Sequence, residues 1–203
     1  MSDAKVRLSQ KEMEIAANAE LILTKNAILK KVNLLLGNLL ENQRQYLESG
    51  SIQLPSEVMQ TSPKISKGEN HNGLPYLILD YPRYFEQDNI LAVRTMFWWG
   101  NFFSITLHLS GRYKKMTEKK IISSFSLLKE KGFYCCVNDD QWAHDFEKNN
   151  YLPLIEISEP DFKHLISDKS FLKLSGKLSL QKWDSAEEIL LNSFGQIIGL
   201  LAD

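Results

Sequence analysis

Apolar, aromatic and β-branched residues are densest between Ile90 and Ser110, where the polar pair Gly100-Asn101 interrupts them. Two such runs joined by a Gly-Asn pair predict a β-hairpin with a primed turn, because that turn matches the twist of the strands. If only Gly100 and Asn101 form the loop, Trp99 lies opposite Phe102 and the pairing continues down both strands. The hairpin at 90–110 is therefore the expected centre of the fold.

The expected register gives the hairpin two different faces, because successive strand residues point to opposite sides. One face holds Ala92, Arg94, Met96, Trp98, Phe103, Ile105, Leu107 and Leu109. The other holds Leu91, Val93, Thr95, Phe97, Trp99, Phe102, Ser104, Thr106 and His108. The first has the composition of a core face. The second mixes aromatic, hydroxyl and imidazole groups, which is typical of a ligand pocket or a partner surface.

The first 48 residues have the pattern of helices. Ser9 and Glu12 have the spacing of a capping box, and apolar residues then recur at steps of four and three from Met13 to Leu39. Thr24 offers a second cap and Gly37 a weak point, so we favour two helices folded back on each other over one long helix. We interpret the apolar stripe as packing against a sheet, with a dimerisation seam as the alternative.

The rest of the chain predicts further elements of a single domain spanning residues 1–203. Residues 49–73 have little apolar periodicity and predict an irregular connection, followed by a sheet with its covering helices over 74–203. Strands are expected at 76–81, 133–137, 152–157 and 171–181, and helices at 117–131 and after Asp184. In the strand at 171–181, alternation places Lys173, Ser175 and Lys177 on an exposed side. We expect an α+β fold with a mostly antiparallel sheet, although a parallel neighbour is compatible with the order strand, helix, strand.

Composition narrows the function classes. The 24 basic and 25 acidic residues give a net charge of -1, so no overall field would draw the protein to nucleic acid or to an anionic membrane. The N-terminal residues lack the apolar core of a signal peptide, and no apolar run is long enough for a membrane helix. We therefore expect a cytoplasmic protein that binds neither nucleic acid nor membranes.

Cysteine and histidine spacing suggests no cofactor or metal. The four histidines show no close ligand spacing, so we expect no metal site and no cofactor. Cys135 and Cys136 are adjacent and are interpreted as reduced, buried thiols. Either could form a catalytic group with His144 and Asp145 if the fold brought them together, but structural thiols are the commoner case.

Arg94 and Asp80 are the two charged residues that fall within strongly apolar strands. An unpaired guanidinium in a core is prohibitively costly, and a carboxylate suits its forked geometry. We expect them to form a structural ion pair, with a ligand carboxylate or phosphate as the alternative partner of Arg94.

These patterns favour a non-catalytic domain that binds a small ligand or a protein. The candidate binding residues are Arg94, Phe97, Trp99, Ser104, Thr106 and His108. One alternative is an enzyme acting on a small anion, with Arg94 holding the anion and His108 as acid or base. The expected register weakens this alternative, because it puts Arg94 and His108 on opposite faces. A second alternative is an assembly protein that forms a homodimer through its N-terminal helices.

Overall fold

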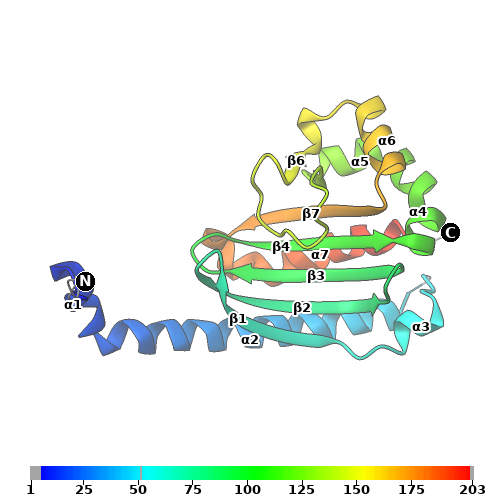
Figure 1. Ribbon diagram of the computed structural model, residues 1–203. Helices are drawn as coiled ribbons and strands as arrows, with labels where there is room; N and C mark the ends of the chain where they lie inside the picture. Colours follow the sequence, from blue (N-terminus) through cyan, green and yellow to red (C-terminus); the bar gives the residue numbers. More distant parts are fainter. Residues whose placement is uncertain (1–5, 51, 202–203) are drawn as a thin grey trace.

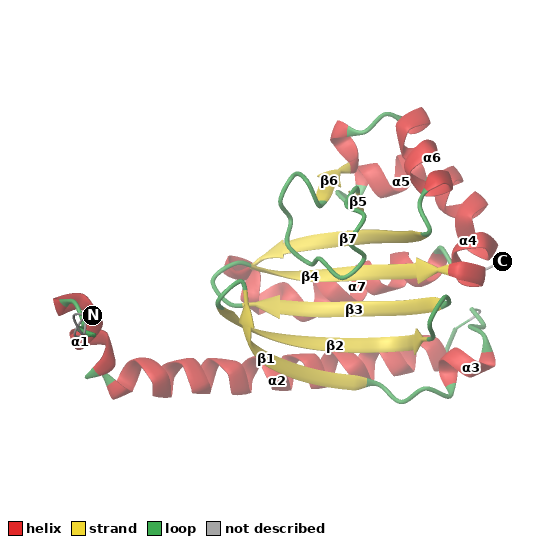
Figure 2. Ribbon diagram, in the orientation of Figure 1, coloured by secondary structure: helices red, strands yellow, loops and turns green. Residues whose placement is uncertain are grey.

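The computed structural model describes residues 6–50 and 52–201 and shows an α+β fold with a seven-stranded antiparallel sheet (Figures 1 and 2). The strand order is β1-β2-β3-β4-β7-β5-β6. The strands are β1 (Lys64–His71), β2 (Leu74–Phe85), β3 (Ile90–Trp98), β4 (Phe102–Ser110), β5 (Tyr134–Cys136), β6 (Tyr151–Pro153) and β7 (Phe171–Ser179). The α-helices are α1 (Gln10–Ala16), α2 (Ala19–Glu48), α3 (Ser56–Met59), α4 (Gly111–Ser123), α5 (Phe125–Glu130), α6 (Glu159–Asp168) and α7 (Ala186–Gly199). Because β7 inserts between β4 and β5, every strand pair described is antiparallel.

The two faces of the sheet are covered by different segments of the chain. Helices α2 and α7 lie behind the sheet in Figure 1, and the irregular segment 137–150 crosses in front of it. The main core is on the helix side, where alternate residues of the central strands, among them Leu79, Phe103 and Leu174, are fully buried. The residues between these in the sequence point to the front face, and they include charged and hydroxyl residues.

The hairpin register differs from the expected one by one residue. Trp98, not Trp99, pairs with Phe102, so the turn has three residues instead of two. The backbone N–H of Trp99 donates to the Pro75 carbonyl at 3.0 Å, which continues the pairing of β3 with β2 and leaves Trp99 unpaired with β4. Asn101 then closes the turn through its side-chain amide, which donates to the Trp99 carbonyl. A shift of one residue reverses which residues of the two strands share a face.

The expected composition of the two hairpin faces is therefore wrong. Arg94 lies opposite Thr106, and Ala92 lies opposite His108, so Arg94 and His108 are on the same side of the sheet. The core face instead combines Phe97 with Phe103.

The expectation that residues 49–73 form an irregular connection is wrong for residues 64–71, which form β1 at the edge of the sheet. Only Ile65 in this strand is a large aliphatic residue, since an edge strand needs little apolar surface. The missed signal is Asn72-Gly73, whose positive φ angles of 50° and 79° form the two-residue turn into β2. Asn-Gly is a strong hairpin signal because both positions tolerate positive φ.

The helical elements also depart from expectation in two places. The capping box at Ser9 is present, but the helix breaks at Asn18, whose side chain caps α2. From there α2 runs unbroken through Gly37, so the expected fold-back is wrong. The helix expected at 117–131 starts earlier, at Gly111, because a φ of 55° lets the chain turn directly out of β4. Thr117 is not a cap and instead donates to the Tyr113 carbonyl.

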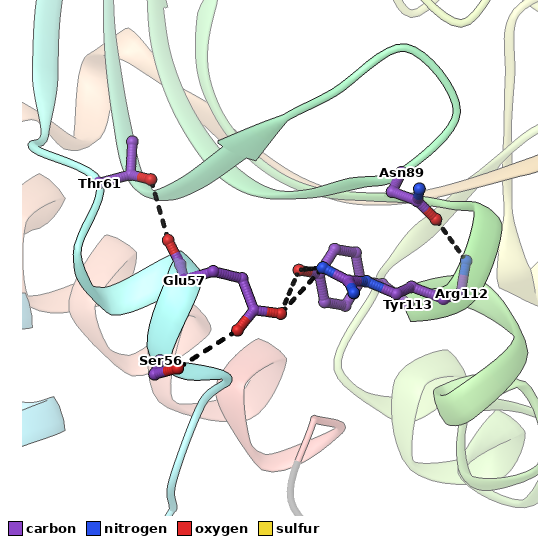
Figure 3. A network of polar contacts seen from close by, with 6 residues as sticks. All are labelled: Ser56, Glu57, Thr61, Asn89, Arg112 and Tyr113. Atoms are coloured by element: carbon purple, nitrogen blue, oxygen red, sulfur yellow. Dashed lines mark hydrogen bonds and ion pairs between the residues drawn. The ribbon is translucent and has the colours of Figure 1, made fainter.

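A polar network joins α3 to the start of α4 (Figure 3). One carboxylate oxygen of Glu57 accepts hydrogen bonds from the Tyr113 hydroxyl and from the Arg112 guanidinium, both at 2.9 Å. The Asn89 side chain accepts from the Arg112 backbone N–H at 2.9 Å. These contacts hold the connection after α2 against the end of the sheet. Within the described residues, no helix is both long and apolar enough to cross a membrane.

Candidate functional site: a basic cluster under residues 137–150

We call residues 137–150 the cover loop, because they lie over the front face of the sheet (Figures 1 and 2). Several of its hydrogen bonds are local turns, in which the side chains of Asn138, Asp140 and Asp145 accept from backbone N–H groups two residues later. Asx turns of this kind shape a loop without pairing it to a strand. Phe146 anchors the cover loop by stacking on Tyr151, with 4.7 Å between the ring centroids.

Arg94 is held by two partners beneath this loop. Its Nε and Nη2 donate to the two carboxylate oxygens of Asp80 at 2.7 and 3.0 Å, which is the pair named from the sequence. Its Nη1 lies 2.7 Å from Nε2 of His144. Since a guanidinium can only donate, His144 accepts at Nε2 and carries its proton at Nδ1. Burial, with the charge of Arg94, holds the pKa of His144 well below its ordinary value.

Lys173 lies beside this group on β7 and is only 1% exposed. The expectation that it faces solvent is wrong, because the cover loop closes over its side of the strand. Its ammonium donates to the Ala143 carbonyl of that loop, and it lies 5.1 Å from the Tyr151 ring centroid. No Asp or Glu in the described part of the chain forms an ion pair with it. Burial lowers the pKa of Lys173 to about 8.

His108 completes the cluster from β4. It is 5% exposed, and its Nε2 lies 3.1 Å from Oε1 of Gln141 in the cover loop. Trp142 covers it edge to face, with 5.5 Å between the ring centroids. Burial, reinforced by the charge of Lys173, lowers the pKa of His108 to about 3, so this imidazole is neutral at physiological pH.

The cluster carries an excess of positive charge at neutral pH. Both histidines are uncharged there, and the carboxylate of Asp80 offsets Arg94. The ammonium of Lys173 remains protonated at pH 7; the carboxylates of Asp140 and Asp145 in the cover loop act on it from a distance, but among the described residues none forms an ion pair with it. A buried charge without a partner is costly, and such groups are concentrated at functional sites.

These side chains meet around a small void. Arg94, Thr106, His108, His144 and Lys173 line it together with Phe85 and Ala92, and its volume is about 10 Å³. That volume is close to the minimum for a single water molecule. A larger molecule can reach these groups only if the cover loop moves away from the sheet.

The structure separates the six candidate binding residues into two groups. Arg94, Thr106 and His108 line the void, and Ser104 lies on the same front face of β4. Phe97 and Trp99 pack with the helix-side core instead. Sequence reasoning missed Lys173, because it alternates with leucines in a strand that also contains Ser175 and Lys177, which is the pattern of an exposed side.

The cysteines are arranged as buried structural thiols. Cys135 and Cys136 are 2% and 3% exposed, and burial raises the pKa of both, that of Cys135 to about 12. His144 directs its Nε2 at Arg94, while the Cys136 thiol faces Asn138 and Asn150. Across residues 6–50 and 52–201, no group of three or more His, Cys, Asp or Glu side chains could hold a metal ion.

Comparison of the chain with known protein families, curated proteins and solved structures found no match. The geometry of the site is therefore the basis on which a function can be argued.

Proposed function

We propose that this protein binds a small anion, carrying a carboxylate or a phosphate, between the front face of the sheet and the cover loop. The observation that carries the proposal is the buried ammonium of Lys173, which forms no ion pair with any carboxylate of the described residues and borders a void together with Arg94 and His108. An anionic group would supply the charge that this cluster lacks. Neutral His108 donates from Nε2 to the Gln141 side chain of the cover loop, so movement of that loop would free this N–H for an oxygen of the anion.

The cover loop is suited to admit such a ligand. Its polar contact with Lys173 is a single hydrogen bond, which the ammonium donates to the Ala143 carbonyl. An anionic oxygen would accept a stronger bond, because it carries the opposite charge. The side chain of Trp142 is 51% exposed even though its ring contacts Phe85 and His108. Lifting the loop at this point breaks ring contacts and the hydrogen bonds that join the loop to Arg94, His108 and Lys173, but no ladder of the central strands.

The test compares two lysines of the same strand and face. Lys173→Met removes the buried charge, and Lys177→Met removes an exposed charge four residues along β7. Phosphate, sulfate, citrate and a series of short dicarboxylates are titrated at constant ionic strength, and the midpoint of thermal unfolding is followed. We expect at least one anion to raise this midpoint saturably in the wild type and in Lys177→Met but not in Lys173→Met.

The pH dependence of binding gives a second readout. Since the pKa of Lys173 is about 8, affinity should fall as the pH rises above that value and the ammonium loses its proton. Absence of saturable binding by every anion of the panel, or an equal effect in Lys173→Met, would overturn the proposal.

The enzyme alternative draws on the same cluster. A lysine whose pKa is near 8 and a neutral histidine are groups that can act as bases. Arg94 is less suited to hold a substrate, because Asp80 and His144 already engage three of its nitrogens. Chemical conversion of a bound anion, abolished in His108→Asn with binding retained, would favour catalysis over binding alone.

A further inference from the structure

Two exposed aromatic rings border the void at the front of the sheet. Phe85 is the most exposed of the residues that line the void, at 38%. Its ring contacts that of Trp142, which belongs to the cover loop and is 51% exposed. Trp142 in turn covers His108, another residue that lines the void. A molecule that enters the void from solvent therefore meets the rings of Phe85 and Trp142.

The indole of Trp142 is held in place by ring contacts. It contacts the rings of Phe85 and His108, and its backbone N–H donates to Asp140 within the loop. Among the residues that the structure describes, none accepts a hydrogen bond from its indole N–H. The indole can therefore shift outward without breaking a hydrogen bond of its own.

The spacing of the two rings is close to that needed to enclose a third. Their centroids are 6.2 Å apart and their planes are tilted by 36°. A flat ring stacked between two others needs about 7 Å between the outer rings, twice the ~3.5 Å contact distance of carbon atoms. An outward shift of Trp142 by about 1 Å, with a rotation that brings the rings parallel, would give this spacing.

The cross-strand pairing places this aromatic pair beside the buried ammonium. Ala92, His108 and Lys173 lie opposite one another on β3, β4 and β7. The void lies where this row has its smallest side chain, the methyl group of Ala92. A ligand with its anionic group at Lys173 and its body over Ala92 therefore extends towards Phe85 and Trp142.

The charge of the cluster favours a carboxylate over a phosphate. Asp80 offsets Arg94, and both histidines are neutral, so the ammonium of Lys173 leaves an excess of one positive charge. A carboxylate matches one charge, whereas a phosphate monoester carries about 1.5 to 2 negative charges at pH 7.

We propose that the ligand of this site is an aromatic carboxylate, whose carboxylate group pairs with the ammonium of Lys173 while its ring lies between Phe85 and Trp142. This inference rests on the proposed function, because it assumes an anion at Lys173, and it names the class of molecule that carries the anionic group.

The test compares carboxylates that differ in what the anionic group is attached to. Benzoate, phenylacetate and phenylpropionate are titrated into the full chain at pH 7 by isothermal titration calorimetry, beside acetate and phosphate. At least one of the three aromatic acids should bind at least about tenfold more tightly than acetate, because its ring is buried between two others. It should also bind about threefold more tightly than the same acid with cyclohexyl in place of phenyl, because stacking adds to burial.

Substitutions at the two rings locate the aromatic body. Trp142→Leu and Phe85→Leu keep an apolar side chain but remove a ring, and each should reduce the preference for the aromatic acid over acetate at least about threefold. Leu127→Ala, at a leucine of α5 that is also 51% exposed, is the matched control and should leave this preference unchanged. Lys173→Met should abolish the binding of aromatic acids and of acetate alike.

The outcomes separate this inference from the proposed function. Saturable, Lys173-dependent binding of acetate or phosphate with no preference for aromatic acids would leave the anion site in place and overturn the aromatic assignment. A preference unchanged in both Trp142→Leu and Phe85→Leu would place the ring elsewhere and overturn it as well. Binding of aromatic acids that is equally tight in Lys173→Met, or no binding of any carboxylate or phosphate, would overturn both.

Discussion

Lys173→Met should stabilise the protein at neutral pH, and the size of the effect follows from the burial of the ammonium. Burial lowers the pKa of Lys173 from its ordinary 10.5 to about 8. At about 1.4 kcal/mol per tenfold change in proton affinity, keeping this lysine charged in the folded state costs about 3 kcal/mol. Methionine has a similar volume and carries no charge, so it removes this cost.

The pH dependence has a definite sign. Below pH 8 both the folded and the unfolded chain hold the proton, and the full cost is present. Between pH 8 and 10.5 the folded protein loses the proton while the unfolded chain keeps it, so the unfolding free energy of the wild type rises relative to that of Lys173→Met. The gap between the two proteins should therefore close by about 2–3 kcal/mol over this window.

Urea unfolding at intervals between pH 7 and 10.5 measures this gap. Both proteins carry Cys136→Ala, because the Cys136 thiol interacts electrostatically with Lys173 and would titrate differently in the two. Using the difference between them then cancels the titration of groups whose effects both proteins share. Lys177→Met provides the matched control: the difference between its unfolding free energy and that of the wild type should not change with pH. If the difference in unfolding free energy between the wild type and Lys173→Met did not change with pH, or grew as the pH rose, Lys173 would not be a buried and unpaired charge.

Two further predictions concern stability. Arg94→Ala and Asp80→Ala should each lower the unfolding free energy by about 3–5 kcal/mol by stranding a buried charge, and the double variant should cost far less than their sum in urea unfolding, whereas additive losses would contradict the pairing. Gly111→Ala should cost about 3 kcal/mol or more, because a Cβ at this positive φ would overlap the Asp88 carbonyl. The control Gly37→Ala, in the open middle of α2, should stabilise by about 0.5–1 kcal/mol; equal effects of the two substitutions would show that the turn into α4 is not strained.

Much of the fold was determined by local patterns in the sequence. The capping box at Ser9, the alternation in β7 and the apolar runs of the central hairpin each predicted an element, because period and capping depend on neighbouring residues alone. The Asp80–Arg94 pair could be named for a similar reason, since a charge in an apolar strand requires a partner. The class of fold, α+β with an antiparallel sheet, followed from these elements.

The register and the site were decided only by the tertiary structure. The Trp99 N–H bonds the Pro75 carbonyl of β2 and the turn contains one residue more than expected; that single residue brings Arg94 and His108 to the same face. Lys173 alternates as an exposed residue should, yet the cover loop buries it. Both outcomes depend on contacts between segments far apart in the chain, and periodicity, which reports only on neighbours, carries no information about them.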